Sequence, residues 1–349
     1  MAFMNIDGSQ GEGGGQILRT SLALSIITGT PIHIENIRAR RKKPGLMRQH
    51  LTAVLAAAEI SGAEVQGATL KSGELWFRPG PVRGGEYHFS VGTAGSACLV
   101  FQTVLPPLLC ADTRSRVVFE GGTHNPMSPP LDFITRSFLP VLGRMGASVQ
   151  VQLERPGFFP AGGGRFVAAI EPWTERTQVE LLVADKIRNQ RARALIAQLK
   201  RDIAVRELRV IREHLGWHSR DCAVEVMRNS RGPGNVVLCE VERGSVTAMI
   251  CAFGQKGIRA ERVAKEAAER TQAFIHSGVP VCEYLADQLM LPMALAGGGR
   301  YLTMPLSLHS KTNRDVIGMF LDLSVDIEET ATGNNRIVNI ARLPAVRAS

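Results

Sequence analysis

The segment Asp7-Gly8-Ser9-Gln10-Gly11-Glu12-Gly13-Gly14-Gly15-Gln16-Ile17-Leu18-Arg19-Thr20 lies between a strand-like start and an amphipathic stretch. Its glycines allow backbone N–H groups to crowd around an anion, and a helix that begins directly after them adds the positive end of its dipole. The segment therefore predicts a phosphate-binding loop. The alternative is a tight turn that lets Leu18, Leu22 and Ile26 reach a core.

This glycine loop matches neither of the common nucleotide-binding motifs. A Walker A motif starting at Gly8 requires lysine where Gly14 stands, and G-x-G-x-x-G starting at Gly11 requires glycine where Gln16 stands. A P-loop ATPase and a Rossmann dehydrogenase are therefore both disfavoured.

The composition is that of a soluble globular protein with a basic balance. The chain has 349 residues, of which 44% are hydrophobic and 21% charged, and this length suggests two domains. Forty-one Lys and Arg against 32 Asp and Glu leave a formal charge of +9. This excess suits a polyanionic partner such as nucleic acid, although a solvated basic face is an equal alternative.

The cysteines and the hydropathy predict a cytoplasmic protein with no membrane partner. No C-x-x-C pair occurs, and no run of 18 apolar residues is present. The cysteines, several in apolar context, are predicted to be reduced core residues. They are Cys98, Cys110, Cys222, Cys239, Cys251 and Cys282.

An internal repeat predicts the fold class, α/β (α+β), with three repeated βαβαββ-like layers. Leu46 corresponds to Leu131, and Gly62-Ala63 to Gly146-Ala147, about 85 residues apart. The units span about 1–85, 86–181 and 279–349, so that 1–181 and 279–349 form one large domain. The sheet of each unit needs helices on one face.

Residues 182–278 break the pattern and predict an inserted smaller α+β domain. An arginine-rich stretch from Lys186 to Glu213 is expected to be helical, and a second helix is expected from Arg259 to His276. Antiparallel strands are predicted between them, at 222–227, 236–241 and 246–251.

In each unit the loop after the second strand precedes a helix N-terminus. These loops are 38–43, 123–125 and 307–313. A cleft lined by three such helix ends would hold a polyphosphate or a nucleic-acid end. His309, in the third loop, is the most reactive candidate because a neutral imidazole attacks phosphorus. A capping or structural histidine is the alternative.

Five strings in combination resemble the RNA 3'-terminal phosphate cyclase family, nearly end to end. They are the glycine loop 7–19, Lys43-Pro44-Gly45-Leu46-Met47-Arg48-Gln49-His50, Gly121-Gly122-Thr123, Phe158-Phe159-Pro160-Ala161-Gly162-Gly163-Gly164 and Glu283-Tyr284-Leu285-Ala286-Asp287-Gln288-Leu289. The resemblance implies ATP-dependent conversion of an RNA 3'-phosphate end to a 2',3'-cyclic phosphate through a covalent enzyme-AMP intermediate. It assigns the adenylylated nucleophile to His309.

The resemblance also implies the other site residues. Glu12 is the carboxylate for Mg²⁺ or Mn²⁺, which prefer oxygen ligands. Tyr284 is expected to stack on adenine opposite Pro129, with Phe133 near the base. The remaining ATP-binding positions are Gln102, Leu285, Ala286, Asp287 and Gln288. The candidates for binding the RNA 3'-phosphate end are Arg19, Arg38, Arg40, Arg41, Gln49 and His50, and arginine can hold a phosphate through two hydrogen bonds.

Two other functions stay open at this point. Inert relatives in the same family act in ribosomal RNA processing and lack the histidine, so His309 argues against such a scaffold. An enolpyruvyl transferase of similar repeat architecture would need its own substrate-binding pattern. His124 departs from several relatives, which puts any nucleotide-binding role of that position in doubt, and the oligomeric state is left open.

Overall fold

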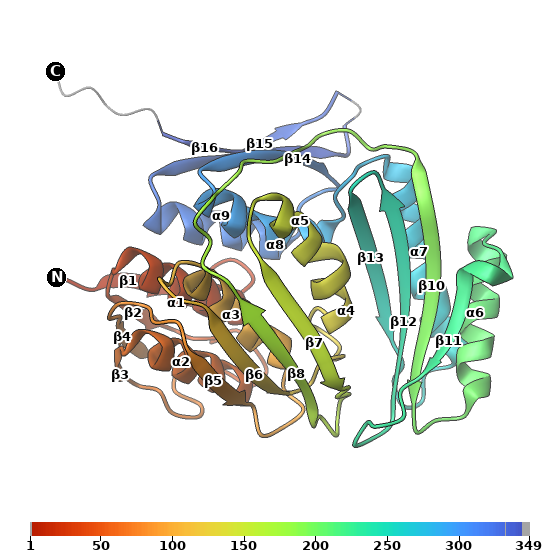
Figure 1. Cartoon of the computed structure of the whole chain (residues 1–349), viewed down its shortest axis with the longest axis horizontal. Coiled ribbons are helices and arrows are strands. Elements are labelled where there is room, and N and C mark those ends of the chain that lie inside the picture. Colours follow the sequence, from red (N-terminus) through yellow and green to blue (C-terminus); the bar gives the residue numbers. More distant parts are fainter. Residues whose placement is uncertain (1, 332, 344–349) are drawn as a thin grey trace.

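The computed structural model describes residues 2–331 and 333–343, which form four mixed four-stranded sheets with helices packed between them (Figure 1). The predicted mixed α/β class is confirmed. The predicted third unit runs to residue 349, and its last six positions, 344–349, lie outside the described residues. No helix in the described part of the chain is long and apolar enough to cross a membrane.

The first unit follows the predicted order. Its sheet has the order β1-β2-β4-β3, in which β1 and β2 are parallel and the other neighbours antiparallel. Because parallel strands need a crossover, α1 connects β1 to β2 across one face. The elements are β1 (Met4–Asp7), α1 (Gly15–Thr28), β2 (Ile32–Glu35), α2 (Arg48–Ser61), β3 (Glu64–Gln66) and β4 (Leu75–Arg78).

The second unit repeats this topology with a modified second helix. Its sheet order is β5-β6-β8-β7, again with one parallel pair. The helix from 131 to 144 contains one π-helical segment, η1. The elements are β5 (Glu86–Ser90), α3 (Ala97–Leu109), β6 (Ser115–Gly121), α4 (Leu131–Phe133), η1 (Ile134–Phe138), α5 (Leu139–Arg144), β7 (Val149–Arg155) and β8 (Gly164–Ile170).

The third unit begins before the insertion. The two-residue strand β9 (Glu180–Leu181), placed by sequence at the end of the second unit, pairs in parallel with β14 of the third sheet. The sheet order is β15-β16-β14-β9. The other elements are α8 (Glu283–Leu295), β14 (Gly298–Thr303), α9 (Leu308–Phe320), β15 (Leu323–Glu329) and β16 (Arg336–Arg342).

The inserted unit differs from the prediction in one element. Residues Ile187–Ala197 of the predicted arginine-rich helix form strand β10, and the helix α6 covers only Arg201–Leu215. Side chains that alternate between the two faces of a strand explain this result: Ala192 and Ala194 are buried in the core, whereas Arg193 between them takes part in ion pairs. The remaining elements are η2 (Ser219–Asp221, a 3-10 turn), β11 (Cys222–Val226), β12 (Gly234–Arg243), β13 (Val246–Phe253) and α7 (Ala260–Ser277).

The expected antiparallel pairing holds for the predicted strands β12 and β13, but not for β11. The order is β11-β10-β12-β13, and β10 pairs in parallel with β11. This pairing is possible because α6 provides the crossover between the two strands.

Helices of the three units meet in the middle of the large domain. Helix α1 packs against α2, α3 and α9, and α8 packs against α9. Figure 1 shows these helices between the sheets, with the third sheet across the top and the inserted unit at the right. Residues far apart in sequence are thus brought to one place, at the N-terminal ends of several helices.

Candidate active site

The glycine loop is bound directly to the third unit. The Glu12 backbone N–H donates to Thr312 Oγ1 at 2.9 Å, and Thr20 Oγ1 donates to Asn313 Oδ1 at 2.8 Å. Gly11 has φ of +57°, and a Cβ there would lie 2.1 Å from Thr312 Oγ1. Glycine at position 11 therefore allows the loop to approach α9 this closely.

His309 lies in the first turn of α9, whereas the sequence predicted a loop. Ser307 caps this helix by accepting from the Ser310 N–H at 3.2 Å, and the His309 side chain is exposed. One turn further, Asn313 donates to the Asp287 carbonyl at 3.0 Å. The positive end of the α9 dipole therefore faces a site where His309 is accessible and a phosphate would be stabilised.

Asp287 is a buried carboxyl group on α8 in the same place. Its Oδ2 accepts from Gln288 Nε2 at 2.8 Å, whereas its buried Oδ1 has no hydrogen-bond partner. Burial raises the pKa of Asp287, although His309 and Arg19 oppose this shift. An unsatisfied buried oxygen next to these groups can accept a proton, a donor group or a cation.

Glu12 closes the N-terminal end of α1. Its side chain is only 4% exposed; one oxygen accepts from the Gln16 N–H at 3.0 Å and the other pairs with Arg41. The Glu12 carboxylate and the free oxygen of Asp287 are the kind of hard oxygen ligands that Mg²⁺ and Mn²⁺ prefer. Glu12 and Asp287 could therefore hold a divalent cation, and this metal position stays a prediction.

A second group of metal-binding residue types lies elsewhere. Among the described residues, His33, Glu35 and Glu74 are the one set of three whose ligand atoms all lie within 4.8 Å of one another. His33 already contacts Glu74 at 2.6 Å. This group is on the first sheet and does not include Glu12, so it adds no ligand to the predicted metal position.

The arginines predicted for the RNA end have different surroundings. Arg19 faces Glu12 and Asp287, and burial lowers its pKa against the effect of both carboxylates. Arg38 donates to the carbonyls of Lys43 and Gly45 at 2.7 and 2.8 Å, which holds the basic loop in shape. Arg40 is exposed, whereas Arg41 pairs with Glu12. Arg40 is therefore the more available of these two cations.

His50 and Gln49 connect α2 to the neighbouring helix ends. A Cβ on Gly15 would lie 2.6 Å from His50 Nε2, so His50 packs against the start of α1. Gln49 Oε1 accepts from the Ser96 N–H at 3.0 Å, at the start of α3. Burial, together with the charges of Arg19, Arg38 and Arg41, lowers the pKa of His50 to about 3.

The lowered pKa of His50 predicts a pH-dependent stability. Because histidine in the unfolded chain has a pKa of about 6.5, the unfolded state binds the proton first. The contribution of neutral His50 to the free energy of unfolding is present above about pH 6.5 and is lost as the pH falls toward 3. Between pH 7 and pH 5 we expect the parent to lose about 2 kcal/mol more free energy of unfolding than His50→Asn. Urea denaturation at both pH values measures this difference. Equal losses in the parent and in His50→Asn would refute the prediction. The control is His276→Asn, which changes an exposed histidine.

A cavity of about 50 Å³, open to solvent, lies between α1, α3, η1, α8 and α9. Across it, Gln102 on α3 donates to Gln288 on α8. The cavity therefore joins four of the predicted residues, Arg19, Gln102 and the Asp287-Gln288 pair. The lining residues are Gln16, Arg19, Thr20, Ala23, Gln102, Leu105, Pro106, Phe138, Asp287, Gln288, Leu291, Pro292 and Asn313.

The residues predicted around adenine have unequal access. Tyr284 is 43% exposed, with the Arg270 guanidinium 5.0 Å from its ring centre. Leu285 and Ala286 are fully buried, so neither presents surface to a nucleotide in this structure. Phe133 is buried in α4 and Pro129 is half-buried before it. The arrangement of Tyr284, Pro129 and Phe133 around a base stays a prediction.

Sequence reasoning missed four polar residues at this site, of which Thr20, Thr312 and Asn313 join two units. Gln16 accepts from Arg19 at 2.8 Å and lies against Thr20, while Thr312 and Asn313 bind the glycine loop and α1. Hydrogen bonds between residues about 300 positions apart leave no periodic signal in the sequence.

Comparison with known proteins shows which family the chain belongs to. A family model described as RNA 3'-terminal phosphate cyclase matches residues 10–327. The chain belongs to the RNA 3'-terminal phosphate cyclase family. The match includes the glycine loop from Gln10 onward and the whole of α9, so both sides of the candidate site lie within the cyclase family's shared region.

Curated relatives in the cyclase family are similar over almost their whole length. An RNA 3'-terminal phosphate cyclase from Koribacter versatilis is 51% identical over 93% of this chain and 91% of its own. The protein of that name from Ectopseudomonas mendocina is 47% identical over 97% of both chains. Among solved structures, an EPSP synthase from Acinetobacter baumannii aligns with a TM-score of 0.37 at 11% identity, over 97% of this chain and 65% of that one, which is too low to support the transferase alternative.

Proposed function

We propose that this chain uses ATP to convert an RNA 3'-terminal phosphate to a 2',3'-cyclic phosphate, through a covalent adenylate on His309. The observation that carries the proposal is the position of His309: it is exposed at the start of α9, and that helix binds the glycine loop through Thr312 and Asp287 through Asn313. Membership of the cyclase family supports the same activity.

The proposed chemistry has two transfers and one ring closure. A ring nitrogen of neutral His309 attacks the α-phosphorus of ATP, and pyrophosphate leaves. The RNA 3'-phosphate then takes the adenylyl group and frees His309. Because the terminal phosphate now carries AMP as a leaving group, the neighbouring 2'-hydroxyl can attack it, forming the cyclic phosphate and releasing AMP.

The chain's own residues supply charge and position for these steps. Arg19 lies at the cavity wall beside Glu12 and Asp287, where it can hold a phosphate oxygen. Glu12 and Asp287 would hold Mg²⁺ or Mn²⁺, which neutralises charge on the triphosphate when bound. All six cysteines are free, which fits a reducing compartment such as the cytoplasm.

Labelling with ATP carrying a radioactive α-phosphate, in the presence of Mg²⁺ or Mn²⁺, tests the proposal. We expect label on the protein that is lost in acid and kept in alkali, as for a phosphoramidate. RNA ending in a 3'-phosphate should then discharge the label and become resistant to phosphatase. A folded protein that takes up no label would instead support the scaffold alternative.

The basic loop offers a prediction that separates the two half-reactions. Arg40→Ala should slow transfer to RNA about tenfold and leave self-adenylylation near the parent rate, because Arg40 is exposed and, unlike Arg41, does not pair with Glu12; its charge acts on Asp7 at the start of the glycine loop. Arg41→Ala should impair both reactions because Arg41 pairs with Glu12. Single-turnover rates of each half-reaction check this, and equal effects of Arg40→Ala on both would place Arg40 in the ATP site.

A further inference from the structure

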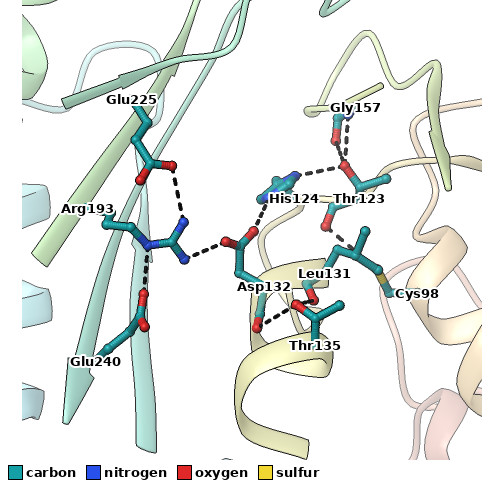
Figure 2. A network of polar contacts seen from close by, with 10 residues as sticks. All are labelled: Cys98, Thr123, His124, Leu131, Asp132, Thr135, Gly157, Arg193, Glu225 and Glu240. Atoms are coloured by element: carbon teal, nitrogen blue, oxygen red, sulfur yellow. Dashed lines mark hydrogen bonds and ion pairs between the residues drawn. The ribbon is translucent and has the colours of Figure 1, made fainter. Parts of the chain in front are cut away.

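One buried ion-pair network joins the inserted unit to the helix at 131–144 (Figure 2). Arg193 on β10 contacts Glu240 at 2.7 Å, Glu225 at 3.2 Å and Asp132 of α4 through three different nitrogens. Its side chain is only 6% exposed. The guanidinium therefore ties three strands of the insert, β10, β11 and β12, to a residue of the second unit.

The opposite side of Asp132 is held by the second unit itself. His124 Nε2 lies 2.8 Å from Asp132 Oδ2, and His124 Nδ1 lies 2.8 Å from Thr123 Oγ1. Figure 2 shows Asp132 between His124 and Arg193. Burial disfavours a charge here, yet the hydrogen bond from His124 and the charge of Arg193 hold the pKa of Asp132 well below its usual range.

Further contacts attach the same helix to the insert. Arg136 in η1 binds Glu240 at 2.8 Å, and Ser137 donates to the Thr247 carbonyl on β13 at 2.5 Å. Figure 1 shows α4 and α5 between the second sheet and the sheet of the insert. One side of this helix is thus fixed by polar groups of the insert.

Other residues of this helix belong to the candidate site. Phe138 lines the cavity that Arg19 and Asp287 share. Pro129 and Phe133, predicted to lie at adenine, flank Asp132 in sequence. Because Phe138 of η1 lines the cavity, a shift of η1 would change the shape of the cavity, whereas His309 lies on a different helix, α9.

We infer that Asp132 and Arg193 are positioning residues through which the inserted unit sets the ATP-binding shape of the cavity. A buried ion pair adds little net stability because desolvation offsets its attraction, whereas its geometry is specific. The Arg193 guanidinium binds three carboxylates, one of which is Asp132 of α4, and these contacts together fix the position and direction of α4. The inference rests on the proposed function only for the identity of the nucleotide.

Asp132→Asn tests the inference, because asparagine keeps the shape and loses the charge. We expect the ATP concentration for half-maximal self-labelling to rise about tenfold, with the maximal rate within about twofold of the parent. Amide hydrogen exchange in 131–138 should become about tenfold faster, while exchange in α9 stays unchanged. Arg191→Gln is the matched control: Arg191 is on the same strand and shares Glu225 at 3.5 Å.

Several results would overturn the inference. They are an unchanged ATP requirement, a lower maximal rate with an unchanged ATP requirement, faster exchange over the whole chain, or an equal effect of Arg191→Gln. If Asp132→Asn does not fold, Arg193→Lys provides the same test, since lysine keeps the charge but cannot reach three carboxylates as a fork. A parent that takes up no label would count against the proposed function, whereas the exchange data test the positioning by themselves.

Discussion

His309→Ala should eliminate the protein-AMP adduct, lowering self-labelling by at least about 10³-fold, because the alanine variant lacks the proposed nucleophile. The His309 side chain is exposed in the first turn of α9, so the fold should be unaffected. Labelling with α-phosphate-labelled ATP measures the loss, and urea denaturation checks that stability is unchanged.

The control for this variant is His276→Ala, which removes an exposed histidine from the last turn of α7. We expect His276→Ala to label like the parent. Full labelling of a folded His309→Ala protein would show that another group carries the adenylate. The same variant also tests the overall reaction, because it should form no cyclic phosphate on RNA.

Glu12→Ala should lower the rate of self-adenylylation by about 10²- to 10³-fold, with partial recovery at high Mn²⁺. The physical reason is that Glu12 is a buried carboxylate that accepts from the first turn of α1, pairs with Arg41 and lies near Asp287. Its loss removes an oxygen ligand for the divalent cation and leaves Arg41 without its partner. Rates measured over a range of Mg²⁺ and Mn²⁺ concentrations test this expectation.

Glu12→Gln separates the two roles of this side chain. The amide can still accept from the Gln16 N–H but carries no charge, so the variant should fold like the parent and stay slow. Glu35→Ala, which removes an exposed carboxylate from β2, is the control. Parent-like rates and metal dependence in both Glu12 variants would mean that Glu12 serves only the fold.

Features with a local pattern could be predicted from the sequence. The repeat, the glycine loop and the helices α1, α2 and α3 follow from hydrophobic spacing and from turn residues near each other in the chain. The strings that carry the family resemblance are local as well. They were enough to indicate the cyclase family, which the match over residues 10–327 confirms.

Two elements of the fold could not be predicted in this way. Strand β9 has two residues and pairs with a strand that begins 117 positions later, at Gly298, so it has no periodic signal of its own. In β10 the mixture of arginine and alanine resembles a helix surface. The alternation of alanine and arginine indicates a buried strand only because the fold places Glu240, Glu225 and Asp132 around Arg193, where they pair with its charge.

The sequence predicted which residues belong to the site, but only the tertiary structure shows which groups surround each of them. In the folded protein Arg41 pairs with Glu12, and Arg38 holds the basic loop in shape. His50 is buried against Gly15, whereas Arg40 is exposed. Residue types and their spacing determine which groups are available for chemistry. Burial and the pairing of charges depend on distances between units that are far apart in the chain, and only the folded arrangement sets those distances.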